Sequence, residues 1–390
     1  MTEFPITPIG EVCAVIAGQS PPGDAYNDQG DGLPFYQGKK DFTDRYLAFP
    51  STWTTHVTKR AGPGDIVMSV RAPVGPINEV REEICIGRGL AAIRNGEDID
   101  RDYLWYALSW LQPEIAGSDG AVFPSINKSQ IEALEIPLPP LDEQKRIVAA
   151  LDQAFAALDR SRVNAEANLF SAQELFKQTL DREFAAIADG VSSVSLQDAV
   201  HPECGLSYGI VQPGDELENG LPIVRPVDLT QREVSLAGLK CIAPEMASGY
   251  ARTTLHGGEL LLSVRGSTGT VSVAASELVG TNVTRGIVPI RFDESRVMRD
   301  FAYFQFLSGA IRTQIAEKTY GAALMQINIK DLRAIRLLVP GIEVQRQIVR
   351  RAEKLLEASV ALRRGYEDRL ADIAALRQSL FQSAFSGQLT

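Results

Sequence analysis

The sequence is poor in residues that hold metals or disulfides, and it has no long apolar run. The four cysteines (Cys13, Cys85, Cys204, Cys241) show no CxxC spacing, which predicts reduced thiols in a cytoplasmic protein rather than a zinc site. The three histidines are far apart and none falls in an HExxH pattern, so no metal site is expected. No apolar run of about 18 residues occurs, and the start MTEFPITPIG lacks a basic segment followed by an apolar one. Neither a membrane span nor a signal peptide is predicted.

Catalytic motifs are missing as well. The Gly-rich segment RGSTGT (265–270) has no lysine after it, so it does not match a phosphate-binding loop. SPPG (20–23) departs from the Asn-Pro-Pro-Tyr motif of adenine methylases, and no GxSxG motif occurs. Glu143-Gln144-Lys145 could end a nuclease motif, but it lies where a helix is predicted to start. We therefore expect no catalytic residue, and no cofactor or metal held by this chain.

Length and composition indicate a globular protein with two domains. The chain has 390 residues, of which 45% are hydrophobic, enough for a sizeable core in each domain. The net charge of −10 argues against nucleic-acid binding, for which a basic surface is expected. The distribution of that charge, discussed below, weakens this objection.

The two halves of the chain repeat each other in order. GDIVMSVRAPVG (64–75) matches GELLLSVRGSTG (258–269), with the first Gly, the Ser-Val-Arg run and the last Gly in the same places. Further matches are Leu33-Pro34 with Leu221-Pro222, Arg88-Gly89 with Arg285-Gly286, Ile126-Asn127 with Ile327-Asn328, and Pro139 and Gln144 with Pro340 and Gln345. The offset grows from 188 (Leu33 to Leu221) to 201 (Gln144 to Gln345), as expected if the second copy has longer loops. The chain is therefore interpreted as two copies of one fold.

Each copy is predicted to be a mixed α/β (α+β) globule followed by a long helix. Short β-type runs such as IVMSV and LLLSV are broken by Gly and Pro, and aromatic-rich helices follow at RDYLWYALSWL (101–111) and RDFAYFQFLSGAI (299–311). The aromatic side chains of these helices are expected in the globule cores rather than against bases. Asn127 and Gln130 have capping-box spacing before a short helix, and Asp331 predicts a weaker box after Asn328.

The long helices show coiled-coil spacing. No Pro or Gly interrupts 141–187, and apolar residues recur alternately every three and four positions. In the first helix these positions are Val148, Leu151, Phe155, Leu158, Ala165, Leu169, Ala172 and Phe176, with breaks at Arg162 and Thr179. In the second they are Ile348, Ala352, Leu355, Leu362, Tyr366, Ile373, Leu376 and Leu380, with breaks at Ser359 and Arg369.

Connectivity then predicts the architecture. If the two helices bury their apolar positions against each other, the second must run back towards the first globule, so the pair is antiparallel with one globule at each end. The expected domains are a first globule (1–140), a first helix (141–187), a second globule (188–340) and a second helix (341–390). Prolines before each helix restrict the angle at which the globule joins it. The alternative is two core helices inside one large domain.

The duplicated layout resembles the specificity subunit of type I restriction–modification systems. The resemblance rests on IPLPPLDEQKRIV and LVPGIEVQRQIV at the helix starts, GDIVMSVRAPVG and GLPIVRPVDLT within the globules, and the terminal SLFQSAFSGQLT (379–390). It covers essentially the whole chain, although Gly341-Ile342-Glu343 departs from the family's Pro-Leu-x-Glu pattern.

The resemblance implies a non-catalytic subunit that reads double-stranded DNA. Each globule would be a target-recognition domain for one half of a bipartite site. The helices would set the spacer between the halves and bind methylase subunits, two in number. S-adenosylmethionine, ATP and Mg would belong to those methylase subunits and to restriction subunits, not to this chain.

Local charge identifies candidate DNA contacts. Residues 39–94 hold nine Lys and Arg against six Asp and Glu, and residues 222–299 hold nine against seven, so the middle of each globule is its least acidic part. The candidates are Lys39, Lys40, Lys59, Arg60, Arg71, Arg225, Arg252 and Arg265, with Tyr320 as a loop aromatic in KTYGAALMQIN, opposite GSDGAVFPSIN of the first copy. Arginine suits both guanine edges and phosphates, and a surface ion pair is the alternative role for each.

Two other functions are compatible with parts of the sequence. One is a fused methylase or nuclease, against which the missing motifs argue. The other is a two-headed coiled-coil adaptor that binds proteins and not DNA. A sequence-selective DNA shift in the presence of a methylase partner would separate the specificity subunit from the adaptor.

Overall fold

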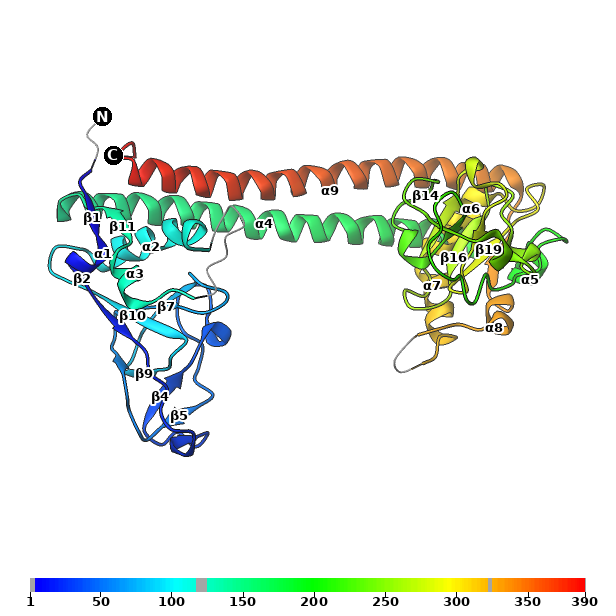
Figure 1. Ribbon diagram of the computed structural model, residues 1–390. Helices are drawn as coiled ribbons and strands as arrows, with labels where there is room; N and C mark the ends of the chain where they lie inside the picture. The colour runs from blue at the N-terminus through cyan, green and yellow to red at the C-terminus, as the bar shows by residue number, and fades with distance from the viewer. Residues whose placement is uncertain (1–3, 117–124, 322–324, 390) are drawn as a thin grey trace. The chain divides into compact units, whose positions relative to one another are not determined.

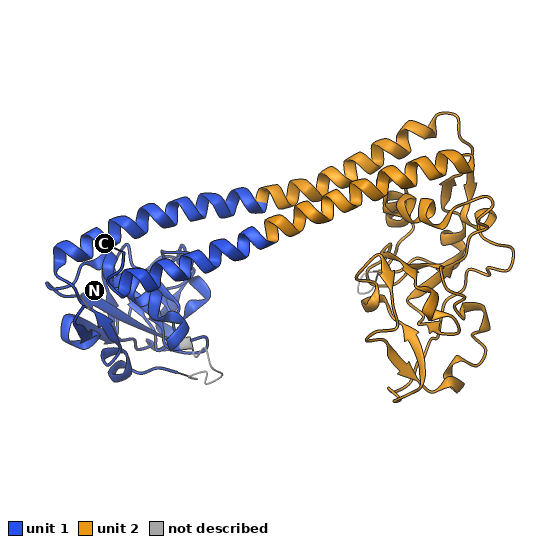
Figure 2. Ribbon diagram, turned by 90° about the horizontal axis from the view of Figure 1, so that it is seen from above, with its two compact units in different colours: residues 1–166, 368–390 blue, residues 167–367 orange. Residues whose placement is uncertain are grey.

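The computed structural model describes residues 4–116, 125–321 and 325–389. The chain divides into two compact units, residues 1–166 with 368–390 (unit 1) and residues 167–367 (unit 2), coloured separately in Figure 2. Both long helices pass from one unit into the other. No helix within the described ranges is long and apolar enough to cross a membrane.

Unit 1 contains a four-stranded sheet, a five-stranded sheet and a two-stranded ribbon. The sheet orders are β2-β10-β7-β8, β3-β5-β4-β9-β6 and β1-β11. The strands are β1 (Ile6–Pro8), β2 (Cys13–Ala17), β3 (Tyr26–Asn27), β4 (Leu33–Tyr36), β5 (Trp53–Thr54), β6 (Arg60–Ala61), β7 (Ile66–Ser69), β8 (Ile77–Glu79), β9 (Ile84–Ile86), β10 (Leu90–Asn95) and β11 (Glu135–Pro137). The ribbon β1-β11 joins the start of the chain to the segment just before the first long helix.

Unit 2 repeats much of this arrangement. Its sheet orders are β14-β17-β16-β19, β15-β13-β18 and β12-β20. The strands are β12 (Ser193–Ser195), β13 (Leu221–Val224), β14 (Glu233–Val234), β15 (Lys240–Ile242), β16 (Leu260–Ser263), β17 (Val271–Ala274), β18 (Asn282–Val283), β19 (Ile287–Ile290) and β20 (Arg336–Leu338). The antiparallel trio β17-β16-β19 matches β8-β7-β10, and the parallel pair β13-β18 matches β4-β9. The predicted duplication is therefore present in the strand pairing.

The helices of the two copies, drawn in Figure 1, come in corresponding order, except that one helix over 101–116 corresponds to two helices, over 299–307 and 309–317, in the second copy. They are α1 (Ile9–Val12), α2 (Arg101–Ala116), α3 (Lys128–Glu132), α4 (Leu141–Ala188), α5 (Leu196–Ala199), α6 (Arg299–Leu307), α7 (Gly309–Glu317), α8 (Ile329–Arg333) and α9 (Ile342–Phe385). Asn127 and Gln130 form the predicted capping box at α3. At α8 the Asn328 side chain still accepts the Asp331 amide, but the reciprocal bond to the cap backbone is replaced by a contact between the two side chains.

The aromatic residues of α2 and α6 lie in the cores, as expected. Tyr103, Phe301, Phe304 and Phe306 are fully buried, and Trp105, Tyr106 and Tyr303 are nearly so. In unit 1 the end of α9 joins this core, because Phe385 packs on Trp110 and Phe381 on Phe155 of α4. In unit 2 Phe184 of α4 packs on Phe301. Both ends of each long helix therefore contribute to a globule core.

The two long helices run antiparallel within each unit. In unit 1, Arg377 of α9 pairs with Asp159 of α4 at 3.0 Å, and in unit 2, Arg351 of α9 pairs with Glu183 of α4 at 3.1 Å. On α4 the predicted seam is buried at Leu151, Phe155, Ala165 and Ala172.

The predicted seam of α9 is wrong at two positions. Leu362 and Leu376 are about half exposed, at 47% and 50%, whereas Phe381 and Ala384 are buried. A straight helix drifts roughly 20° per heptad away from a strict seven-residue repeat. Such drift does not by itself account for the two positions, because Tyr366, Ile373 and Leu380, further along the same predicted seam, are partly buried.

A buried glutamine fixes each long helix to its globule. Gln144 Nε2 donates to the carbonyls of Asp98 (3.0 Å) and Pro139 (2.8 Å), and its Oε1 accepts the Asp100 amide (2.7 Å). Both the NH2 group and the carbonyl oxygen of the Gln144 side chain therefore have hydrogen-bond partners within the protein. In both helices the glutamine bonds to the backbone carbonyl five residues before it, which accounts for the shared spacing but not for the choice of proline.

Candidate nucleic-acid interface

The best-matched motif of the two copies forms a turn that presents an arginine. Ser69 and Ser263 are buried at the end of β7 and β16. The Ser69 hydroxyl donates to the Arg71 carbonyl (3.1 Å), and the Ser263 hydroxyl donates to the Arg265 carbonyl (3.3 Å). Gly75 and Gly269 close the turns at φ of 106° and 91°, a region that favours glycine. The Ser-to-Gly spacing that the two copies share in their sequences is therefore set by the length of this turn.

Backbone pairing holds the turn against the segment before α3 or α8. Arg71 forms a bridge with Ser125, and Arg265 forms one with Gln326. The amide of Ile126 donates to Val70, and that of Ile327 donates to Val264, both at 3.0 Å. The presented arginine is thus fixed from two sides in each copy.

A second arginine lies beside the first in both copies. The Val70 amide donates to the Gly89 carbonyl (3.0 Å) and the Val264 amide to the Gly286 carbonyl (2.8 Å). This bond brings Arg88 next to the turn of unit 1 and Arg285 next to the turn of unit 2. The matched Arg-Gly dipeptides were visible in the sequence as repeat landmarks, yet neither arginine was among the predicted contacts.

These four arginines have charges available to a ligand. None of Arg71, Arg88, Arg265 and Arg285 forms an ion pair with a residue in the described part of the chain. The Arg265 Nε is buried and has no hydrogen-bond partner there. In unit 1 Arg71 and Arg88 line a cavity of about 470 Å³ together with Lys128. Guanidinium groups so placed can hold a phosphate or a guanine edge.

The other predicted contacts are distributed unevenly. Tyr320 is half-exposed and its backbone pairs with Gln326, which places it beside Arg265. Arg60 is paired with Glu83 at 2.8 Å, and Arg225 with Asp228 at 2.9 Å, so both charges already have partners. Lys39, Lys40, Lys59 and Arg252 are exposed, and none of the four lines the cavity of Arg71 and Arg88. Lys59 nevertheless lies near it, because its carbonyl accepts the amide of Ile86 at 3.0 Å, two residues before Arg88. Most of the loop GSDGAVFPSIN, at 117–124, lies outside the described residues.

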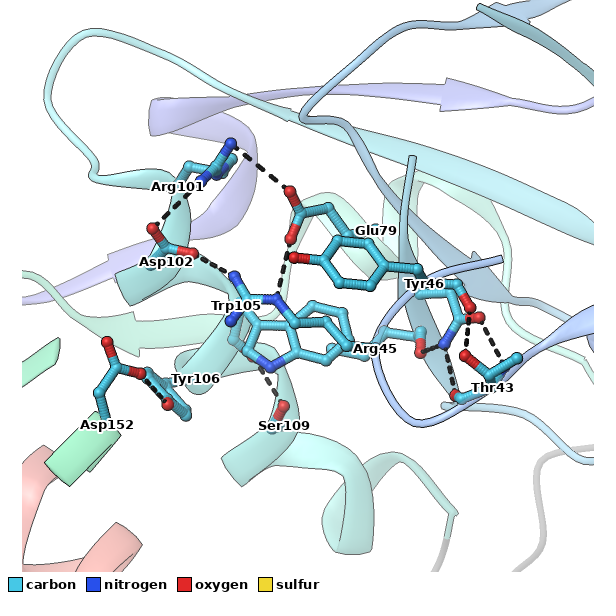
Figure 3. Close-up of polar contacts among 12 residues, drawn as sticks. Thr43, Arg45, Tyr46, Glu79, Arg101, Asp102, Trp105, Tyr106, Ser109 and Asp152 are labelled. Carbon is cyan, nitrogen blue, oxygen red and sulfur yellow. Dashed lines mark hydrogen bonds and ion pairs between the residues drawn. The ribbon is translucent and has the colours of Figure 1, made fainter. Parts of the chain in front are cut away.

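A different pair of arginines, absent from the predicted contacts, supports the globules internally. Arg45 contacts Glu79 at 3.0 Å and also Asp102, and its guanidinium lies 5.3 Å from the Trp105 ring (Figure 3). Burial lowers the pKa of Arg45, but the bonds to Glu79 and Asp102 outweigh burial and raise that pKa overall. These contacts hold the segment around Arg45 against the start of α2.

The matching arginine of unit 2 is Arg232. Its carbonyl accepts the Val273 amide, as the Arg45 carbonyl accepts the Glu79 amide, both at 2.7 Å. Arg232 pairs with Asp300 (3.4 Å) and lies over Tyr303. Because Val273 offers no carboxylate, Arg232 uses Glu353 of α9 instead, at 3.2 Å.

In the described ranges no cluster of three or more metal-ligating side chains occurs.

Comparison with solved structures supports the fold. One chain, from a structure described as "Structural basis underlying complex assembly and conformational transition of the type I R-M system", superposes with a TM-score of 0.81 over 100% of both chains at 21% identity. The HsdS subunit from Thermoanaerobacter tengcongensis gives a TM-score of 0.57 at 20% identity, covering 99% of this chain and 97% of that one.

Sequence comparison identifies curated relatives. The EcoBI specificity subunit of a type I restriction enzyme from Escherichia coli is 23% identical over 94% of this chain and 82% of that protein. The putative MjaX specificity subunit from Methanocaldococcus jannaschii is 46% identical over 139 residues, which are 35% of this chain and 32% of that protein. The family model of the type I restriction modification DNA specificity domain matches residues 1–168 and 215–370. With both globules and most of both long helices matched, the chain belongs to the type I restriction modification DNA specificity domain family.

Proposed function

We propose that this chain is the DNA-reading subunit of a type I restriction–modification complex and that each globule reads one half of a bipartite site. The observation that carries the proposal is the repeated arginine pair: Arg71 and Arg265 lie on the same turn of each globule, and Arg88 and Arg285 lie beside it. Two globules of the same fold that each read DNA would together read a site with two halves. Because the arginine turns hold their backbone in place before any ligand arrives, little ordering would be required on binding.

The long helices are proposed to set the spacer between the half-sites. Each globule is fixed to its helix by a buried glutamine, so a change in helix length would be passed to the globule. Half-sites must recur at a defined distance along DNA, and stiff connectors provide that better than flexible linkers do.

Methylation and cleavage are proposed to reside in partner subunits. Methylase subunits, two in number, would bind S-adenosylmethionine, and restriction subunits would bind ATP and Mg. The net charge of −10 indicates weak DNA binding by the isolated chain, since few phosphates would be neutralised. The methylases would add phosphate contacts, and the complex would act on DNA in the cytoplasm.

A direct test is to express the chain with its methylase partner in a host without DNA methylation and to map the methylated motifs. A bipartite motif with a fixed spacer is expected. No sequence-selective methylation, together with no selective DNA shift, would leave the two-headed adaptor as the better reading.

A deletion in the helical pair tests the spacer. Arg369 contacts Ser161 across the helices at 3.4 Å, so deleting 160–163 together with 368–371 removes facing segments. Four residues remove roughly 6 Å of helix, which corresponds to about two base pairs of DNA. We expect a shifted spacer with both half-sites unchanged. Altered half-site bases at an unchanged spacing would contradict this role.

A further inference from the structure

The first globule has an open pocket where the second has a tyrosine. The segment AGQSPPGD (17–24) aligns with YGIVQPGD (208–215). The Gln19 amide donates to the Ile86 carbonyl (3.0 Å), and the Ile210 amide donates to the Val283 carbonyl (2.8 Å). Ile86 and Val283 hold matching places in the parallel pairs β4-β9 and β13-β18. The sequence and the bonds of the second residue along therefore align Ala17 with Tyr208, although Ala17 pairs with Ala91 at the end of β2 whereas Tyr208 lies outside the strands.

The tyrosine spans the space that the alanine leaves open. In unit 2 the Tyr208 hydroxyl donates to the Ile327 carbonyl at 3.1 Å, next to the cap residue Asn328. In unit 1 Ala17 cannot reach that far. The matching residues Ile126 and Asn127 instead line the cavity of about 470 Å³, with Ala17 on the other side.

The positively charged lining of the open pocket favours binding of an anion. Its charged lining residues in the described part of the chain are Arg71, Arg88 and Lys128, and no carboxylate lines it. Lys128 shares its charge with Glu132 at 3.5 Å, whereas Arg71 and Arg88 have no ion pair with described residues. Two guanidinium groups around a cavity of this size suit a phosphate group and its adjoining sugar.

We propose that this pocket binds a phosphodiester of the DNA strand held by the first globule, and that Ala17 keeps it open. The second globule contacts DNA with its matching arginines, Arg265 and Arg285, but Tyr208 fills the place of the pocket. The two readers therefore grip DNA differently although they share a fold. This inference rests on the proposed function, and it identifies a phosphate site within one globule.

Closing the pocket without changing its charge provides the test. Ala17 is exposed at the end of β2, so Ala17→Tyr adds a side chain without disturbing the core, and Ala17→Ser is the matched control that leaves the pocket open. The complex of the full chain with its methylase partner is titrated with duplex carrying the mapped site, at several salt concentrations. Phosphate-ethylation interference is measured on the same duplex.

For Ala17→Tyr we expect a roughly tenfold weaker Kd, a salt slope smaller by about one, and loss of one interfering phosphate in the first half-site. Ala17→Ser should match the parent complex. Arg88→Gln changes an exposed side chain and should remove interference at the same phosphate. This variant tests the proposal even if Ala17→Tyr does not fold.

The inference is overturned if the parent complex binds its site selectively and Ala17→Tyr or Arg88→Gln leaves affinity, salt slope and interference pattern unchanged. It is also overturned if Ala17→Tyr abolishes binding of inorganic phosphate to the free chain but leaves DNA binding intact, because the pocket would then serve a free anion. Absence of any selective binding by the parent complex counts against the proposed function instead.

Discussion

Gln144 and Gln345 are both fully buried and make the same three hydrogen bonds at the start of the two long helices. Gln345 Nε2 donates to the carbonyls of Arg296 and Pro340, and its Oε1 accepts the Met298 amide, each at 2.8 Å. Gln144 uses the matching residues Asp98, Pro139 and Asp100. An amide side chain is suited to this place because it offers two donors and an acceptor at one position.

Replacing Gln144 with methionine should therefore be costly. The change keeps the side-chain volume but leaves the Asp100 amide and two carbonyls without partners, so a loss of about 3 kcal/mol in the free energy of unfolding is expected. Gln345→Met should cost a similar amount. Denaturant unfolding of the full chain measures both. Gln153→Met, on the exposed side of α4, is the control and should change stability by less than about 0.5 kcal/mol.

The two copies diverge at a buried carboxylate, and a matched pair of substitutions tests the consequence. Asp65 forms two bonds with Arg94, at 2.7 and 2.8 Å. Its counterpart Glu259 is equally buried but has an Oε2 without a hydrogen-bond partner among described residues, because Arg291 bonds to Glu203 instead.

Asp65→Asn should destabilise the chain by about 2 kcal/mol, a moderate value because Arg94 remains half-exposed and can be solvated. Glu259→Gln should cost less than Asp65→Asn, since it breaks no hydrogen bond at Oε2 and keeps the acceptor for the His256 amide, although the new amide NH2 is also without a partner among the described residues. Thermal unfolding of the two variants compares them directly. An equal loss in both would show that Glu259 has a partner in solution.

Gly365 is a weak point of α9. It lies inside the helix, and a Cβ added there would meet no atom within 4 Å. Gly365→Ala should raise the free energy of unfolding by roughly 0.5–1 kcal/mol, because alanine loses less backbone entropy than glycine in a helix. A shift of the denaturation midpoint to higher denaturant measures the gain. Destabilisation would mean that a partner approaches the helix closely at this residue.

The ion pairs of Arg45 and Arg60 should differ in their contribution to stability. Arg45→Met removes bonds to Glu79, whose side chain is only 8% exposed, and to Asp102, so a loss of about 2 kcal/mol is expected. Arg60→Met breaks an exposed pair with Glu83 and should cost less than about 1 kcal/mol. Urea unfolding at low and high salt separates them, because salt should reduce the Arg60 contribution more strongly than that of the less exposed Arg45 pairs.

For DNA binding, Arg265 should matter more than Arg225. Arg265 has no ion pair with a described residue and lies on the repeated turn, whereas Arg225 already bonds to Asp228. Arg265→Gln is expected to weaken binding of the methylase complex by about 1–3 kcal/mol and to relax or lose the second half-site. Arg225→Gln should leave the mapped motif unchanged. Methylome mapping and DNA titration provide the two measurements, and the opposite ranking would refute the assignment of the turn.

The candidate interface was only partly predictable from the sequence. The motif shared by 64–75 and 258–269 made Arg71 and Arg265 candidate contacts, because such a turn places Ser and Gly at a fixed spacing that can be recognised in the sequence. Arg88 and Arg285 reach the same place through strand pairing between distant segments, which has no local signal. Arg60 and Arg225 were equally plausible by charge, and only their packing against Glu83 and Asp228 distinguishes them. The four-domain division and the DNA contacts remain predictions.

By itself the sequence determined that the chain is a duplication with two long helices, because repeated motifs and apolar periodicity are local properties that survive without coordinates. Tertiary structure decided which charges have partners among the described residues, that Ala17 lines an open pocket, and that the Tyr208 hydroxyl bonds to the Ile327 carbonyl. Those outcomes depend on side chains that meet across tens to hundreds of residues. The local sequence around a residue does not show which distant side chain it will contact.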